Sequence, residues 1–128
     1  MSYELYDYID GRGTNEFKAW TQSLQKRDRA KLNAKLDMLV KLGPELIPHV
    51  LTGTPTPGIQ KLRVKGNVQL RPMLCAGPIF IEKEFTLLLG AKEVQSKFVP
   101  KDADKIADKN KADIVSDSTR RVRHERVS

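Results

Sequence analysis

The sequence predicts an α+β fold in which a small twisted antiparallel sheet carries two N-terminal helices and one C-terminal helix. Two segments show helical patterning, because apolar side chains recur at helical spacing over residues 14–42 and helix-favouring residues return over 100–117. Between them, residues 59–89 contain short alternating or apolar runs separated by Gly and Pro. A length of 128 residues is typical of one domain. We expect this domain to span residues 1–117 and to be followed by a basic, flexible tail at 118–128.

Residues 3–10 are predicted to form the first strand, because aromatic and aliphatic side chains alternate there with acids. We expect Thr14 to cap the first helix and Glu16 to lie in its first turn, where the helix dipole favours an acid. The apolar stripe of this helix consists of Phe17, Trp20 and Leu24.

Asp28 is the expected N-cap of a second helix, which Gly43 and Pro44 end. The apolar stripe of this second helix consists of Leu32, Leu36, Leu39 and Val40. The connection from there to Gly58 is rich in Pro and Thr, and it has room for one short helical turn at residues 45–51.

Three strands are predicted next. Residues 59–64 alternate cleanly, and Gly66 with Asn67 forms a hairpin turn to a return strand that Pro72 restricts to an edge or a bulge. Residues 85–89 form a third, more buried strand. The C-terminal helix has a thin apolar stripe, so it is either a surface helix or one that docks only on a partner.

Positive charge is concentrated in one part of the chain. The net charge is +7, and residues 60–101 hold 8 basic side chains against 3 acidic ones. Lys61, Arg63 and Lys65 share one face of a strand at period two, and Arg71 can join them from the paired strand. Because burying several cations together is costly, this face either meets water or binds a polyanion through its phosphates. Three further lysines extend this basic zone: Lys92, Lys97 and Lys101.

Other reactive residues are few. The single cysteine, Cys75, lies in an apolar segment typical of core packing, and nothing in the sequence singles out a pairing with His49. The two histidines form no metal-ligand spacing and there is no Gly-rich phosphate loop, so we expect no metal and no cofactor. No signal peptide and no apolar run of membrane-spanning length is visible, which predicts a cytoplasmic protein without a membrane partner.

Three short segments, residues 58–63, 69–71 and 87–93, resemble motifs of the RelE/HigB superfamily of toxins from bacterial and phage toxin–antitoxin pairs, and in particular its phage-derived HigB-like branch. The segment 58–63 is similar to the family's glycine, apolar, "ELR" strand, and 69–71 to its "YR" on the return strand. The segment 87–93, with Lys97 and Pro100, is similar to "LLHGFxKK…P". The order of predicted elements agrees with this family to about Asp117.

The sequence departs from the family pattern at three positions: Leu70 replaces the tyrosine, Ala91 the aromatic residue and Glu93 the second lysine. After the third strand, no histidine or tyrosine occurs before His124, so the family's C-terminal general acid or base has no clear counterpart.

The resemblance implies a RelE-like endoribonuclease that cleaves ribosome-bound mRNA without a metal and is neutralised by a small antitoxin protein. Such cleavage requires attack of a ribose 2′-OH on the adjacent phosphate, helped by a base, an acid and cations. The resemblance assigns Arg63, Arg71 and Lys92 to catalysis, and it implies that Lys61 and Lys65 are phosphate ligands or alternative bases. The RNA-binding set is then Lys61, Lys65, Lys97 and Lys101. The alternatives are a non-catalytic module that binds RNA or the ribosome, and a gyrase-targeting toxin of the same superfamily.

Overall fold

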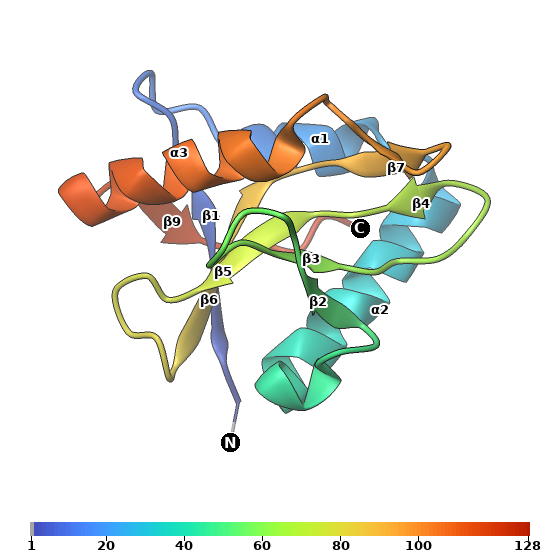
Figure 1. Ribbon diagram of the computed structural model, residues 1–128, viewed down its shortest axis with the longest axis horizontal. Coiled ribbons are helices and arrows are strands. Elements are labelled where there is room, and N and C mark those ends of the chain that lie inside the picture. The colour runs from blue at the N-terminus through green and yellow to red at the C-terminus, as the bar shows by residue number, and fades with distance from the viewer. Residues whose placement is uncertain (1) are drawn as a thin grey trace.

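The computed structural model describes residues 2–128 and shows an α+β fold (Figure 1). The six-stranded sheet has the order β2-β3-β5-β6-β1-β9, and a second, antiparallel sheet has the order β4-β7-β8. The strands of the large sheet are β1 (Glu4–Tyr8), β2 (Leu51–Gly53), β3 (Gln60–Leu62), β5 (Met73–Ala76), β6 (Glu84–Leu89) and β9 (Arg121–Arg123). Those of the small sheet are β4 (Gln69–Leu70), β7 (Lys92–Val94) and β8 (Lys97–Val99). The helices are α1 (Glu16–Ser23), α2 (Lys26–Leu42), α3 (Ala103–Ser116) and a 3-10 turn, η1 (Gly43–Leu46).

The large sheet is mixed, so the expectation of a wholly antiparallel sheet is wrong at one pairing. Strand β1 runs parallel to β6, with Leu5 opposite Phe85, whereas β1 and β9 are antiparallel. Parallel neighbours need a long crossover connection, and the helices α1 and α2 lie in the segment that joins these two strands. The N-terminal strand therefore lies inside the sheet rather than at its edge.

The C-terminal residues belong to the sheet, which corrects the prediction of a separate flexible tail at 118–128. Residues 121–123 form β9, and the backbone N–H of His124 donates to the carbonyl of Leu5 with an N···O distance of 3.0 Å. The free edge of β1 offers unpaired backbone groups, and the tail satisfies them. The basic side chains of this segment reach acids of the domain, as Arg121 does with Glu84.

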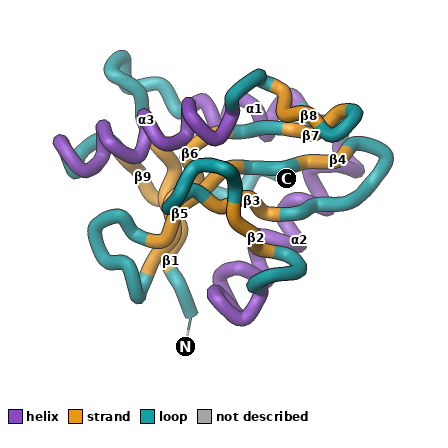
Figure 2. The backbone as a smooth tube through the Cα atoms, viewed as in Figure 1, coloured by secondary structure: helices purple, strands orange, loops and turns teal. Residues whose placement is uncertain are grey.

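Helices cover both faces of the large sheet (Figure 2). On one face, α1 and α2 bury Phe17, Leu32 and Leu39 against strand residues such as Leu62 and Leu87. On the other face, α3 packs against β5 and β6 through three side chains that are fully buried: Ala103, Ala107 and Ile114. The thin apolar stripe of α3 therefore packs on the protein's own sheet while its other side chains are largely exposed, so α3 is a surface helix and the alternative of docking only on a partner is wrong.

Several boundaries differ by a few residues from those expected. Asn15 rather than Thr14 caps α1, and its side chain accepts a hydrogen bond from the Lys18 N–H. Gln25 precedes α2, which places Asp28 in the first turn of the helix instead of at the cap. The predicted stop at Gly43 is confirmed, with φ at +51°.

Two further features follow from local sequence. Pro72 divides the return strand, so that β4 pairs with β7 in the small sheet and β5 pairs with β3 and β6 in the large one. The helical turn expected at 45–51 is the 3-10 turn at 43–46.

Within residues 2–128, no helix combines the length and the apolar composition needed to cross a bilayer.

Replacement of Arg121 tests the role of the C-terminal strand. Glu84 is 1% exposed, pairs with Arg121 and accepts a hydrogen bond from the Ile79 N–H. Arg121→Ala leaves this carboxylate buried without its counter-charge, so we expect a loss of roughly 3–5 kcal/mol in the free energy of unfolding. The matched control is Arg126→Ala, which breaks an exposed pair with Asp37 and is expected to cost about 1 kcal/mol or less. Urea denaturation measures both, and equal losses would contradict the structural role of β9.

Candidate functional site

A cluster of four charged residues lies where the two sheets meet. It consists of Lys61, Arg63, Arg71 and Glu93, and we refer to it as the Glu93 cluster. Lys61 lies on β3 opposite Met73, Arg63 follows β3, and Glu93 lies on β7 opposite Gln69. Arg71 occupies the short link between β4 and β5, where its backbone N–H donates to the Ala91 carbonyl at 2.8 Å. The chain thus brings three separate segments together at this point.

Glu93 is the only acid of the cluster. Its Oε1 atom lies 3.8 Å from Lys61 Nζ and 3.8 Å from Arg71 Nε. Both distances exceed hydrogen-bond length, so the carboxylate offsets the positive charge of the two side chains without accepting a hydrogen bond from either. The side chain is 27% exposed, which leaves it open to solvent or to a ligand. Three cations against one carboxylate leave this group of four with an excess of positive charge.

The two arginines carry unmade hydrogen bonds. Arg71 is 5% exposed and donates from Nη1 to the Leu70 carbonyl at 2.8 Å and from Nη2 to Gln69 Oε1 at 3.3 Å. The Nε atoms of Arg71 and Arg63 are both buried, and neither has a hydrogen-bond partner among residues 2–128. Burial lowers the pKa of Arg71, Glu93 opposes the shift and the nearby Arg63 adds to it. A buried donor without an acceptor is destabilising, so these groups favour an added anion.

The structure brings together three of the predicted site residues and separates the others. Lys61, Arg63 and Arg71 meet in the Glu93 cluster. Lys92 directly precedes Glu93 on β7, so the two side chains lie on opposite faces of the small sheet. Lys97 shares the Lys92 face, because its cross-strand partner is Val94. The last two predicted lysines, Lys65 and Lys101, are exposed in loops outside the named strands.

Two residues of the site were missed by sequence analysis. Glu93 was treated only as a departure from a family pattern, although it is the counter-ion of two cations here. Phe98 lies opposite Glu93 on β8, and the Lys61 ammonium lies 5.1 Å from the centroid of its ring. Residues 92–94 show no alternation of apolar and polar side chains, so the sequence carried no local signal for β7 or for its partner strands.

A second polar centre lies at the other edge of the large sheet. Asp7 is 1% exposed, with its Oδ1 atom 2.9 Å from His124 Nδ1 while its Oδ2 atom accepts a hydrogen bond from Asn15 at 2.9 Å. His124 follows β9, at the opposite end of the strand order from β2 and β3, so it does not belong to the Glu93 cluster. This pairing fastens the C-terminal segment to the sheet.

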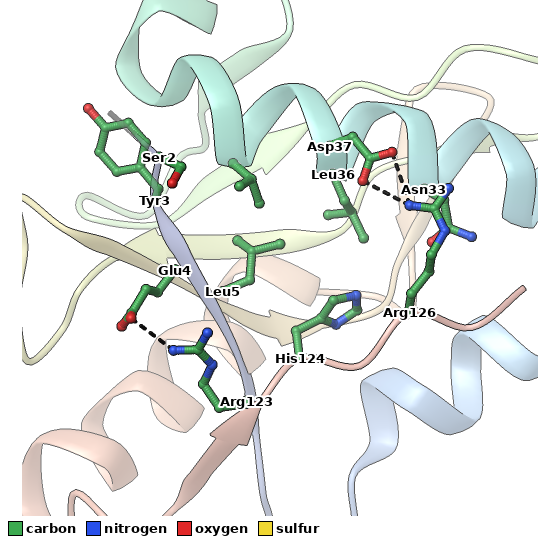
Figure 3. Close-up of a pocket in the computed structure, with 11 residues that line it drawn as sticks. Ser2, Tyr3, Glu4, Leu5, Asn33, Leu36, Asp37, Arg123, His124 and Arg126 are labelled. Carbon is green, nitrogen blue, oxygen red and sulfur yellow. Dashed lines mark hydrogen bonds and ion pairs between the residues drawn. The ribbon is translucent and has the colours of Figure 1, made fainter.

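His124 also lines a hollow of about 430 Å³ (Figure 3). In this view Arg126 reaches Asp37 of α2, and Arg123 reaches Glu4 of β1. The arginines at this hollow are therefore already paired with carboxylates. The hollow lacks the excess positive charge that distinguishes the Glu93 cluster.

The remaining candidates for chemistry are structural. Cys75 is fully buried on β5, and burial raises the pKa of its thiol to about 12. His49 is exposed in the loop after η1. Tyr8 donates a hydrogen bond to Asp113 of α3 at 2.6 Å, and burial with this bond raises the pKa of the Tyr8 hydroxyl to about 12. Across residues 2–128, no three His, Cys, Asp or Glu side chains converge in a way that could hold a metal ion.

Comparisons of the chain with protein-family models, with curated proteins and with solved structures give no match. The function is therefore argued from the geometry of the molecule.

The buried thiol gives a simple check of the site assignment. With a pKa of about 12, Cys75 carries almost no thiolate at a pH of about 8, and its sulfur is shielded from solvent. We expect a thiol-specific chromogenic reagent to modify the folded protein at less than about one-hundredth of the rate in concentrated urea. Fast modification of the folded protein would show that Cys75 is accessible and would make it a candidate nucleophile.

Proposed function

We propose that the protein is a toxin-like endoribonuclease of the RelE/HigB type and that the Glu93 cluster is its catalytic site. One observation carries this proposal. Arg63 and Arg71 hold buried N–H groups without acceptors, next to a partly exposed carboxylate and within a group of net positive charge. Arg63 is partly exposed, so its guanidinium can bind an RNA phosphate, and the carboxylate supplies a base beside it.

The roles within the cluster follow from exposure. Arg63 and Lys61 are partly exposed and would contact the non-bridging oxygens of the scissile phosphate. Arg71 is too buried for extensive contact with RNA, so its role shifts from the direct phosphate contact expected from sequence to positioning Glu93 and adding charge. The exposed lysines Lys65, Lys97 and Lys101 would bind phosphates further along the strand.

The proposed reaction needs no group beyond these side chains. Glu93 accepts the proton of the ribose 2′-OH, and the 2′-oxygen attacks the adjacent phosphorus. The bond from phosphorus to the 5′-oxygen breaks, and the Lys61 ammonium donates a proton to this leaving oxygen. The products are a 2′,3′-cyclic phosphate and a 5′-hydroxyl. The positive charge of Arg63 stabilises the charge that develops on the phosphate oxygens.

The proposed substrate is mRNA on the ribosome in the cytoplasm, and the proposed natural inhibitor is a small antitoxin protein. The excess of positive charge around the Glu93 cluster suits both a polyanionic substrate and an acidic inhibitor. The arrangement of β1, α1, α2 and the following hairpins supports a RelE-like relationship, together with the motif resemblance of residues 58–100.

A second candidate function is a non-catalytic module that binds RNA or the ribosome. It is favoured by the position of Glu93 between Lys61 and Arg71, which a purely structural counter-ion would also occupy. Such a module would keep the salt-sensitive RNA binding of the basic zone but would release no product.

Controlled expression in a bacterial host tests the proposal, with primer extension on abundant transcripts as the measurement. We expect growth arrest and new 5′ ends that depend on translation of the message. Arg63→Ala and Glu93→Gln should each reduce cleavage by roughly 10²-fold or more, because each removes a group needed in the transition state. The matched control is Lys41→Ala, which removes an exposed cation at the end of α2 and should leave cleavage unchanged.

The same experiment separates the two candidates. If the soluble wild-type protein leaves all transcripts intact but binds RNA in a salt-dependent way, the non-catalytic module is correct. If Glu93→Gln retains full cleavage while Arg63→Ala does not, the cluster binds the phosphate and the base lies elsewhere.

A further inference from the structure

A cavity of about 460 Å³ lies on the other side of β7 from the Glu93 cluster. The junction of α1 and α2 forms one wall, and the small sheet with its flanking loops forms the other. Its volume is in the range of small-molecule binding sites. The residues that matter for its chemistry are Trp20, Asp28, Gly90 and Lys92.

Asp28 supplies an acceptor without a donor. It is 6% exposed, lines the cavity, and makes no side-chain hydrogen bond or ion pair with any of residues 2–128. Its place in the first turn of α2 stabilises the negative charge through the helix dipole. A carboxylate with this burial normally has N–H partners, so the cavity is suited to a ligand that brings donors.

Trp20 supplies a flat, fixed surface beside this carboxylate. Its indole lies directly on the backbone of Gly90, where an added Cβ would come within 2.1 Å of Trp20 Cδ2. Phe17 supports the ring from α1, with the two ring centroids 5.4 Å apart. Trp20 remains partly exposed in the cavity, so a planar ligand can stack on it.

Lys92 sets the sign of the charge at the rim. Its side chain is exposed, and in the part of the chain that the structure describes it pairs with no carboxylate. A free cation here attracts an anionic ligand and repels a cationic one, as does the net charge of +7. The cavity therefore combines an acceptor, a stacking surface and a cation for one ligand.

We propose that this cavity binds a guanine base of single-stranded RNA. Guanine alone among the four RNA bases presents two adjacent N–H donors on one edge, which match the two oxygens of a carboxylate. Adenine and cytosine present a donor beside an acceptor, and uracil presents one donor between two carbonyls. Asp28 thus selects guanine, Trp20 stacks on it, and Lys92 binds its phosphate.

The proposal rests on the proposed function in taking RNA as the ligand, and it adds a base preference to it. Lys92 and Glu93 are consecutive residues on β7, so the guanine site and the Glu93 cluster are separated by the thickness of one strand. An arginine side chain from a protein partner also offers paired N–H donors, but the free Lys92 cation opposes it.

Fluorescence titration tests the proposal directly, because Trp20 is the single tryptophan of the chain. Full-length protein is titrated with GMP, AMP, CMP and UMP. We expect GMP to quench the emission with at least about tenfold higher affinity than the others. Asp28→Asn should lower the affinity for GMP by about tenfold or more and remove the preference, because it replaces one acceptor by a donor. The matched control is Asp37→Asn, an exposed acid on the same helix, which should change nothing.

A second comparison tests the cation. Lys92→Ala should weaken binding of GMP but leave binding of guanosine unchanged, because guanosine carries no phosphate. Thermal melting of each variant establishes that it is folded. Equal quenching by all four nucleotides, no quenching by GMP, or stronger quenching by N-acetylarginine amide would each overturn the proposal.

The outcome is separable from that of RNA cleavage. Glu93→Gln should reduce cleavage by roughly 10²-fold or more and leave GMP binding intact. GMP binding in a protein that cuts no transcript would sustain the guanine site and reject the nuclease. Cleavage without base preference and without GMP binding would sustain the nuclease and reject the guanine site.

Discussion

The structure is governed by the need of each charge buried on a strand of the large sheet for a partner. Helices cover both faces of the large sheet, so a charged side chain on a central strand survives only where another group compensates it. Asp7 has His124 and Asn15, and Glu84 has Arg121. Both pairings tie the C-terminal segment to the domain. The polar contacts that neutralise the interior are thus the same contacts that complete the sheet.

Sequence patterns predicted the elements that depend on local periodicity. The apolar stripe of α2, its end at Gly43 and the buried run of β6 follow from helix and strand periods and from glycine geometry. The parallel pairing of β1 with β6 and the addition of β9 depend on contacts between distant segments, which periodicity does not encode. The charge of residues 118–128 suggested solvent exposure because its acidic partners, such as Glu84, lie far away in the sequence.

The candidate site shows the same division. Period two correctly placed Lys61 and Arg63 on one face, and the link to Arg71 followed from a hairpin. The same period places Lys92 and Glu93 on opposite faces of β7. Only the pairing of β7 with β4 shows which of the two lies beside Arg71. In the sequence, Glu93 is a departure from the family motif; in the structure, it is the counter-ion of Lys61 and Arg71. Likewise, Asp28 fits the pattern of a helix cap but lines a cavity instead.

The interior position of β1 has a consequence for how the chain reaches its native state. Strand β1 is made before β6 and must wait for it, and the second edge of β1 stays open until residues 121–123 have been made. Such pairing between the two ends of the chain gives a high contact order, which slows folding because a long loop must close first. During synthesis the two N-terminal helices can form early, but the sheet on which they pack cannot. The large sheet is therefore complete only after residues 121–123 have been made, although its other strands all precede them in the chain.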